Sequence, residues 1–132
     1  MKKFFAISVI AASLFVFAPY NSAFAGNIEM IYWGAKNCPP CKSWEKLHKE
    51  NVKSALRSNG VNYVEVMKPR IKDKFSNMHS DNKMVRSIML AGAPTNIPHY
   101  TYMKDGERLF DVVGFTKTWK SEHDKIMKAL LN

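Results

Sequence analysis

Apolar residues between positions 26 and 67 are spaced as expected for a strand, a helix and a second strand. Ile28 to Trp33 is a short apolar run that ends at a glycine, which is typical of a buried strand. From Pro39 to Asn59 apolar residues recur on one helical face, and Asn59-Gly60 closes that pattern as a helix C-terminus does. Val61 to Met67 is rich in β-forming residues. This βαβ order predicts two parallel strands joined by a right-handed crossover.

The pattern is less regular between residues 68 and 98. Lys68 to Ser80 is polar and basic with no clean period, so we expect a loop. Helical spacing returns from Asp81 to Ala91, with Ser80 or Asp81 as the N-cap and Gly92 as the stop. Prolines then interrupt residues 93–98, which predicts a second loop.

The last third of the chain predicts a hairpin and a final helix. His99 to Lys104 and Glu107 to Val113 flank Asp105-Gly106, which is the strongest short hairpin signal. Thr116 or Thr118 then opens a helix with one apolar side. The complete order is β-α-β-α-β-β-α. It predicts an α/β fold in which helices cover both faces of a mixed four-stranded sheet, as one domain over residues 26–132.

The first 25 residues have the three-part pattern of a secretory signal peptide. Met1-Lys2-Lys3 is a positive head, Phe4 to Ala18 is an apolar run, and Ala23-Phe24-Ala25 supplies the small residues that a signal peptidase recognises. We therefore expect cleavage after Ala25 and a mature protein in the bacterial periplasm. The alternative is an uncleaved anchor, but the run is shorter than the roughly 20 residues that span a bilayer.

Composition narrows the function further. The 132 residues include 20 Lys and Arg, 11 Asp and Glu, and two cysteines, with a formal charge of +9. Loss of Lys2 and Lys3 with the signal peptide leaves +7. Two cysteines exclude a disulfide-dense scaffold and a four-thiolate zinc site. Export argues against nucleic acid as a partner. No second apolar stretch is long enough to cross a membrane, and we expect a monomer.

The basic run in the loop after the second strand has two interpretations. It consists of Lys68, Arg70, Lys72 and Lys74. A solvated loop is the simpler interpretation, and a contact with an acidic protein or an anionic membrane surface is the other.

Cys38-Pro39-Pro40-Cys41 lies where the first strand gives way to the first helix. Free backbone N–H groups and the helix dipole favour a thiolate at Cys38, which makes it a usable nucleophile. Cys41 lies one turn into the helix, within reach of the first sulfur. Such a pair can form a disulfide, attack a substrate disulfide and resolve the mixed intermediate. Pro39 and Pro40 suit a first turn, whose N–H groups have no partners in the helix.

Other interpretations of the cysteine pair remain. A structural disulfide would contribute little stability, because a four-residue loop closes little chain entropy. Two thiolates with His or Met could also hold Cu(I), which would make the protein a copper carrier or a non-enzymatic redox adaptor. The placement between strand and helix favours redox chemistry by the cysteines themselves, without a metal or another cofactor.

Four further residues are candidates for the surroundings of the motif. Lys36 and Lys42 flank it and could stabilise a thiolate. Trp33 is a candidate for a rim contact with the substrate, with core packing as the favoured role. His99 could approach the sulfurs, with a surface position as the favoured one.

Taken together, these features resemble the thioredoxin-like superfamily over nearly all of residues 27–131. The element order matches its minimal fold, the cysteine motif has the placement of its active site, and Ile97-Pro98 matches its cis-proline site. The resemblance implies that Cys38 is the attacking thiol and Cys41 the resolving thiol. It also implies that Pro98 packs in cis opposite the pair, while Ile97 offers backbone hydrogen bonds to a bound peptide.

The direction of electron flow follows from finer resemblances and departures. Asn37 stands where thioredoxins usually carry Trp, and the first strand offers only Glu29 in place of their buried Asp. Ile97 before the proline resembles the reducing members, and Val61 to Asn96 has no room for the helical insertion of periplasmic oxidases. We therefore expect a thiol-disulfide oxidoreductase that passes electrons to disulfides of partner proteins. A membrane-bound donor would re-reduce it, because the periplasm is oxidising. A dithiol oxidase of the same fold is the alternative.

Overall fold

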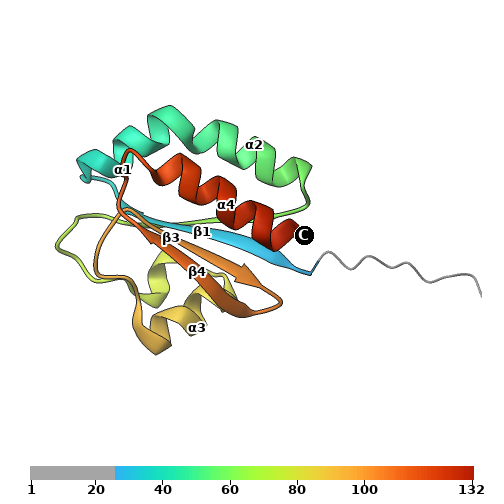
Figure 1. The fold of residues 1–132 in the computed structure, drawn as a ribbon. Helices are drawn as coiled ribbons and strands as arrows, with labels where there is room; N and C mark the ends of the chain where they lie inside the picture. The colour runs from blue at the N-terminus through green and yellow to red at the C-terminus, as the bar shows by residue number, and fades with distance from the viewer. Residues whose placement is uncertain (1–25) are drawn as a thin grey trace, which may run out of the picture.

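Four strands form one mixed sheet in the computed structural model, which describes residues 26–132. The strands are β1 (Ile28–Ala35), β2 (Asn62–Lys68), β3 (His99–Lys104) and β4 (Glu107–Val113), and their order in the sheet is β2-β1-β3-β4. β1 pairs in parallel with β2, whereas β3 is antiparallel to both β1 and β4. The predicted fold class is therefore confirmed (Figure 1). The predicted signal peptide and its cleavage site lie outside the described residues.

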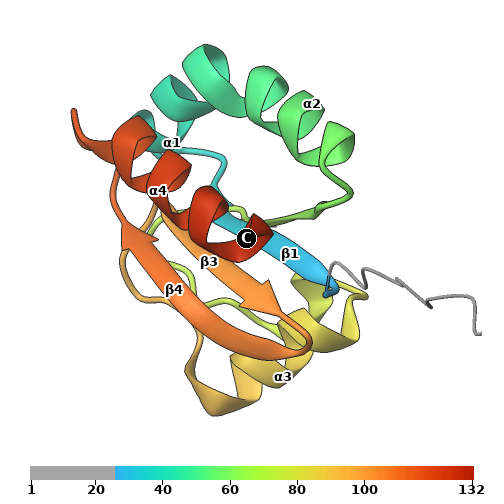
Figure 2. The ribbon, with the colours of Figure 1, turned by 45° about the vertical axis from the view of Figure 1, so that its right-hand side comes forward.

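Helices cover both faces of the sheet. A long helical run passes from α1 (Pro39–Trp44) through a π-helical stretch, η1 (Glu45–Lys49), into α2 (Glu50–Ser58). This run and α4 (Trp119–Leu131) lie on one face, and α3 (Lys83–Gly92) lies on the other, as Figures 1 and 2 show. The sequence predicts a single helix over 39–59, so the wider π-helical turn in its middle is an addition from the structure.

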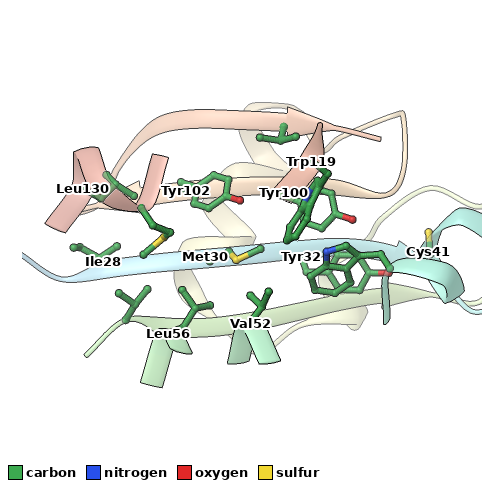
Figure 3. Close-up of a cluster of buried hydrophobic side chains, with 14 of the residues drawn as sticks. Ile28, Met30, Tyr32, Cys41, Val52, Leu56, Tyr100, Tyr102, Trp119 and Leu130 are labelled. Carbon is green, nitrogen blue, oxygen red and sulfur yellow. The ribbon is translucent and has the colours of Figure 1, made fainter. Parts of the chain in front are cut away.

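The two faces of β1 supply two separate hydrophobic clusters because successive side chains of a strand point to opposite faces. Met30 and Tyr32 enter the cluster beneath α2 and α4, which Figure 3 shows. Ile31 and Trp33 enter the cluster beneath α3. All four side chains are fully buried. β1 is thus a central strand with two apolar faces, which explains why its sequence is a continuous apolar run.

Aromatic rings dominate the cluster beneath α2 and α4. Tyr32 and Tyr100 come from adjacent strands, Trp44 from α1 and Trp119 from α4, with ring centroids between 4.4 and 5.6 Å apart. Tilted and edge-to-face pairs of this kind each contribute about 0.5–1.5 kcal/mol beyond their area burial. Because Trp44 is the last residue of the short helix α1, this aromatic group holds the helix that carries the cysteine motif onto the sheet.

The N-terminus of α3 differs from the predicted one. Neither Ser80 nor Asp81 caps the helix; the Asn82 side chain accepts hydrogen bonds from the backbone N–H groups of Met84 and Val85, at 2.9 and 3.2 Å. Ser80 instead accepts a hydrogen bond from the Asn82 N–H. All three residue types make good caps. The choice among them depends on where burial of the apolar face of the helix places its first turn.

The hairpin and the last helix agree with the expected pattern. Asp105 and Gly106 both have positive φ, at 52° and 81°, as a tight two-residue turn between antiparallel strands requires. α4 begins at Trp119 after Thr118, whose hydroxyl donates to Glu122 instead of capping a backbone N–H.

Candidate active site

The cysteine motif lies at the edge of the sheet where all four strands have an end. Ala35 at the end of β1 pairs with Lys68 at the end of β2. Trp33 pairs with His99 at the start of β3, and His99 pairs with Val113 at the end of β4. The motif follows β1 after a short link, so it shares this edge with the loop after β2 and the loop before β3.

Cys38 is the N-cap residue of α1, and Pro39 and Pro40 occupy its first two positions. Cys38 and Cys41 form a disulfide with an S–S distance of 2.03 Å. The Cys38 sulfur also accepts a hydrogen bond from the Cys41 backbone N–H at 3.2 Å. The first sulfur therefore lies against a free N–H of the helix start, an arrangement that stabilises a thiolate once the disulfide is reduced.

Both cysteines are covered in this disulfide state. Cys38 is 1 % exposed and Cys41 is fully buried, and both belong to the cluster beneath α2 and α4. The resemblance implies that Cys38 attacks the substrate, so its burial is a finding that the sequence does not predict. A sulfur of another protein can reach Cys38 only after the residues that cover it move.

Pro98 directly precedes β3, at the edge of the sheet that carries the motif. The Ile97–Pro98 peptide bond is cis, and Pro98 is buried. Its carbonyl oxygen accepts a hydrogen bond from the Gly114 N–H at 2.7 Å, and Gly114 has a φ of +83° that favours glycine. Ile97 is partly buried and packs against both hydrophobic clusters. The loop before β3 is thereby held to the end of β4.

A polar pair that the sequence analysis does not identify joins the cluster beneath α2 and α4 to the half-buried Glu45. The Tyr32 hydroxyl donates a hydrogen bond to Glu45 Oε1 at 2.9 Å. Glu45 is one helical turn after Cys41, and Figure 3 shows Tyr32 and Cys41 at the same end of the cluster. Burial raises the pKa of Tyr32 above its usual range, and the hydrogen bond to Glu45 raises it further. The spacing of residues is the one sequence signal for this pair. Tyr32 points to the face of β1 that α2 and α4 cover, and Glu45 follows Cys41 by four residues, which is about one helical turn.

Trp33 and His99 lie away from the sulfurs. Trp33 is fully buried in the cluster beneath α3, on the opposite side of β1 from both cysteines, and its Nε1 donates to Thr101 Oγ1 at 3.1 Å. His99 is 7 % exposed, so the expected surface position is wrong. Its Nε2 lies 2.7 Å from Asp111 Oδ1, because the hairpin register brings that carboxylate next to the start of β3.

Asp111 is the centre of this second polar group. Burial raises the pKa of Asp111, but hydrogen bonds from His99, Arg108 and Thr101 outweigh that effect and lower it to about 2. The carboxylate therefore stays charged and supports the hairpin.

The flanking lysines Lys36 and Lys42 are exposed. The hydrogen bonds that join this segment to the loop after β2 are made by the Lys36 backbone and the Asn37 side chain. The Lys36 N–H donates to the Lys68 carbonyl oxygen at 3.1 Å, and Asn37 Oδ1 accepts a hydrogen bond from the Ile71 N–H at 2.8 Å. The start of the basic loop is thus tied to the two residues that precede Cys38.

Within residues 26–132, no group of three or more His, Cys, Asp or Glu side chains is arranged to hold a metal ion. No helix in that range is long and apolar enough to cross a membrane.

Comparison with known proteins identifies the fold. No protein-family model and no curated protein matches the sequence. Among solved structures, a protein described as a thiol:disulfide interchange protein DsbE from Chlorobium tepidum matches with a TM-score of 0.58 and 18 % identity, over 82 % of each chain. Thioredoxin from Trypanosoma brucei brucei matches with a TM-score of 0.55 and 14 % identity, over 81 % of this chain and 78 % of the other. Thioredoxin O2 from Arabidopsis thaliana matches with a TM-score of 0.53 and 16 % identity, over 81 % and 77 %.

The fold is therefore thioredoxin-like. At sequence identities of 14–18 %, the likeness concerns the fold alone.

Proposed function

We propose that this protein is a thiol-disulfide oxidoreductase in which Cys38 and Cys41 form the redox-active pair. The observation that carries the proposal is their disulfide at the N-terminus of α1, directly after the central strand β1 and at the same sheet edge as Pro98. A disulfide across four residues contributes little to stability, so redox chemistry explains the arrangement better than a structural role does.

The reaction follows from the geometry of the pair. In the reduced protein, the Cys38 thiolate attacks one sulfur of a substrate disulfide; a mixed disulfide forms and the other substrate sulfur leaves as a thiolate. The Cys41 thiolate then attacks Cys38 Sγ, forms the intramolecular disulfide and releases the second substrate thiolate. Two electrons pass to the substrate, whose two thiolates take up the two protons that the cysteines release. No cofactor is needed, since the cysteine pair holds both electrons.

The direction and the location belong to the same proposal. We place the protein in the periplasm on the signal-peptide pattern of residues 1–25 and favour reduction of partner-protein disulfides. The Chlorobium protein of the same fold, described as a thiol:disulfide interchange protein, is in keeping with this activity. A reductase in an oxidising compartment needs a supply of electrons, which we assign to a membrane-bound donor.

The reduction potential of the pair tests the direction. It is measured by equilibrating the protein with mixtures of reduced and oxidised glutathione and quantifying the Cys38–Cys41 disulfide. We expect a value at or below roughly −230 mV, in the range of reducing members of this fold. A value near about −120 mV would make the protein an oxidant and refute the proposed direction.

Trapping tests the activity itself. Cys41→Ser should accumulate a mixed disulfide with a disulfide-containing peptide, because the resolving thiol is missing. Cys38→Ser is the matched control and should accumulate none. If neither variant forms an adduct and the reduced wild-type protein leaves the peptide unchanged, the disulfide is structural and the proposed function is wrong.

A further inference from the structure

A cavity lies between the two loops at the sheet edge that carries the cysteine motif. Its volume is about 360 Å³. One wall is the basic loop after β2, and the other is the loop before the cis-proline; together they contribute Lys68, Ile71, Lys72, Lys74, Phe75 and Pro94, among others. The cavity has room for a few side chains of another chain. We call it the basic cavity.

The basic cavity is held next to the motif by two contacts. The Asn37 side chain accepts the hydrogen bond from the Ile71 N–H, one residue before Cys38. The Lys68 carbonyl accepts the hydrogen bond from the Lys36 N–H. Two residues that line this cavity are therefore hydrogen-bonded to the two residues that precede Cys38 in the chain.

The charge of the basic cavity is positive and not neutralised from within. Lys68 is 3 % exposed, and its Nζ donates to the Asp73 carbonyl oxygen at 2.7 Å and lies 4.7 Å from the centre of the Phe75 ring. Lys72 and Lys74 are exposed. In residues 26–132 none of these three lysines forms an ion pair with a carboxylate.

The one carboxylate at the cavity is already paired. Arg70 Nε donates to Asp73 Oδ2 at 3.2 Å, and the Arg70 guanidinium forms an ion pair with Asp73 Oδ1 at 3.1 Å. Arg70 is thus the main partner of Asp73, and this one carboxylate offsets the three lysines only in part. Burial lowers the pKa of Lys68, and Asp73 opposes that shift only in part, which is the response of a cation without a close counter-charge.

The cavity also offers apolar surface. Ile71 is 47 % exposed, and Phe75 and Pro94 contribute further apolar wall. A membrane surface would meet only the exposed rim, whereas a peptide can enter the hollow and contact both the apolar wall and the lysines that line it. The combination of apolar wall and lysines in one hollow thus favours a peptide over a lipid surface.

We infer that the basic cavity is the docking site for the substrate protein, and that it selects an acidic segment carrying an apolar side chain close to the disulfide to be reduced. This inference rests on the proposed function and specifies its substrate class. Lys72 and Lys74 attract the acidic side chains, and Ile71 and Phe75 receive the apolar one.

The test compares peptides that differ in one charge position. The three sets of disulfide peptides carry Glu, Gln or Lys, respectively. Within each set, the charged or neutral residue is placed at increasing distance from the cysteine, at the same positions in all three sets. Each peptide is mixed with pre-reduced protein, and the rate constant of a single turnover is measured. We expect the wild-type rate constant to follow Glu over Gln over Lys, by about threefold to tenfold between the Glu and Lys peptides at low salt. That range corresponds to two partly exposed ion pairs.

Charge reversal supplies the decisive variants. Lys72→Glu combined with Lys74→Glu should reverse the order to Lys over Gln over Glu. The matched control is Lys125→Glu combined with Lys128→Glu, which has the same net charge as the first double variant. Both control positions lie on the exposed side of α4, on the opposite face of the sheet from α3. The control should keep the wild-type order.

Three outcomes would overturn the inference. One is an equal rate constant for all peptides with the wild-type protein. Another is the same change of order in the control variant, which would reduce the effect to net charge. The third is binding to phosphatidylglycerol vesicles that depends on Lys72 and Lys74, together with an order of peptide rate constants that does not depend on them. This result would mean that the two lysines bind a membrane surface. Failure of the proposed function is distinct, since wild-type protein would then not reduce even the neutral bis(2-hydroxyethyl) disulfide.

Discussion

Lowering the pH should destabilise the protein through His123, which lies in α4 and is 5 % exposed. The Tyr102 hydroxyl lies 2.8 Å from its Nδ1, and the imidazole stacks on the Trp119 ring with the ring centroids 5.0 Å apart. The pKa of His123 is lowered to about 4, mainly by burial; Asp124 opposes this shift, and the nearby Lys120 and His48 add to it. The native state therefore holds this imidazole neutral, with the tyrosine hydroxyl donating to it.

The size of the effect follows from proton linkage. Between pH 6.5 and about 4 the unfolded chain binds a proton at His123 that the native protein does not, so stability falls as the pH falls through this window. The full shift corresponds to about 3 kcal/mol, and by about pH 5 some 2 kcal/mol should be lost relative to neutral pH. Asp111 does not contribute there. Its pKa is lowered to about 2, so its contribution to stability is present above its usual pKa and is lost only below about pH 4.

Urea unfolding followed by tryptophan fluorescence measures this loss, because all three tryptophans are fully buried. His123→Gln retains a hydrogen-bond acceptor for Tyr102 but cannot be protonated, so its free energy of unfolding should change by about 2 kcal/mol less between pH 7 and pH 5. Lys128→Gln, on the exposed side of the same helix, should retain the wild-type pH dependence. Equal pH dependence in the wild-type protein and His123→Gln would refute the reasoning.

Three substitutions test other parts of the site. Trp33→Phe removes the buried hydrogen bond to Thr101 and some packing, and should lower the free energy of unfolding in urea by about 1–2 kcal/mol. Gly114→Ala places a side chain at a φ of +83° and should cost about 1–2 kcal/mol in the same assay; an unchanged midpoint would contradict the need for glycine. Asn37→Ala removes the hydrogen bond to the Ile71 N–H and should raise amide hydrogen exchange at Ile71 by roughly fivefold to tenfold without a change in global stability, whereas unchanged exchange would show that the basic loop is held by other contacts.

The sequence predicts the fold well because its strongest signals are local. The run Ile28 to Trp33 and the Asp105-Gly106 turn each determine an element within a few neighbouring residues. The hairpin register brings Asp111 near His99, but the burial of His99 depends on tertiary packing around the start of β3 and is not predicted. A polar residue type does not reveal that environment.

The parts of the site that the sequence does not predict depend on contacts between distant segments. The Tyr32–Glu45 hydrogen bond joins a strand to a helix, and the bond from Ile71 to Asn37 joins residues 34 positions apart. The covered state of Cys38 likewise results from tertiary packing around the helix start. Periodicity reports which face of an element is apolar, and it does not report which loop lies over that face.

The burial of Cys38 has a consequence for the speed of electron transfer. A disulfide with almost no solvent exposure is open to a free thiol only during the moments when the surrounding residues part. At high concentrations of a small reductant, the rate of reduction should stop rising with concentration and level off at the opening rate. The pair would then be kinetically insulated from the bulk redox buffer of its compartment. Electrons would move promptly only to and from partners whose binding itself opens the site.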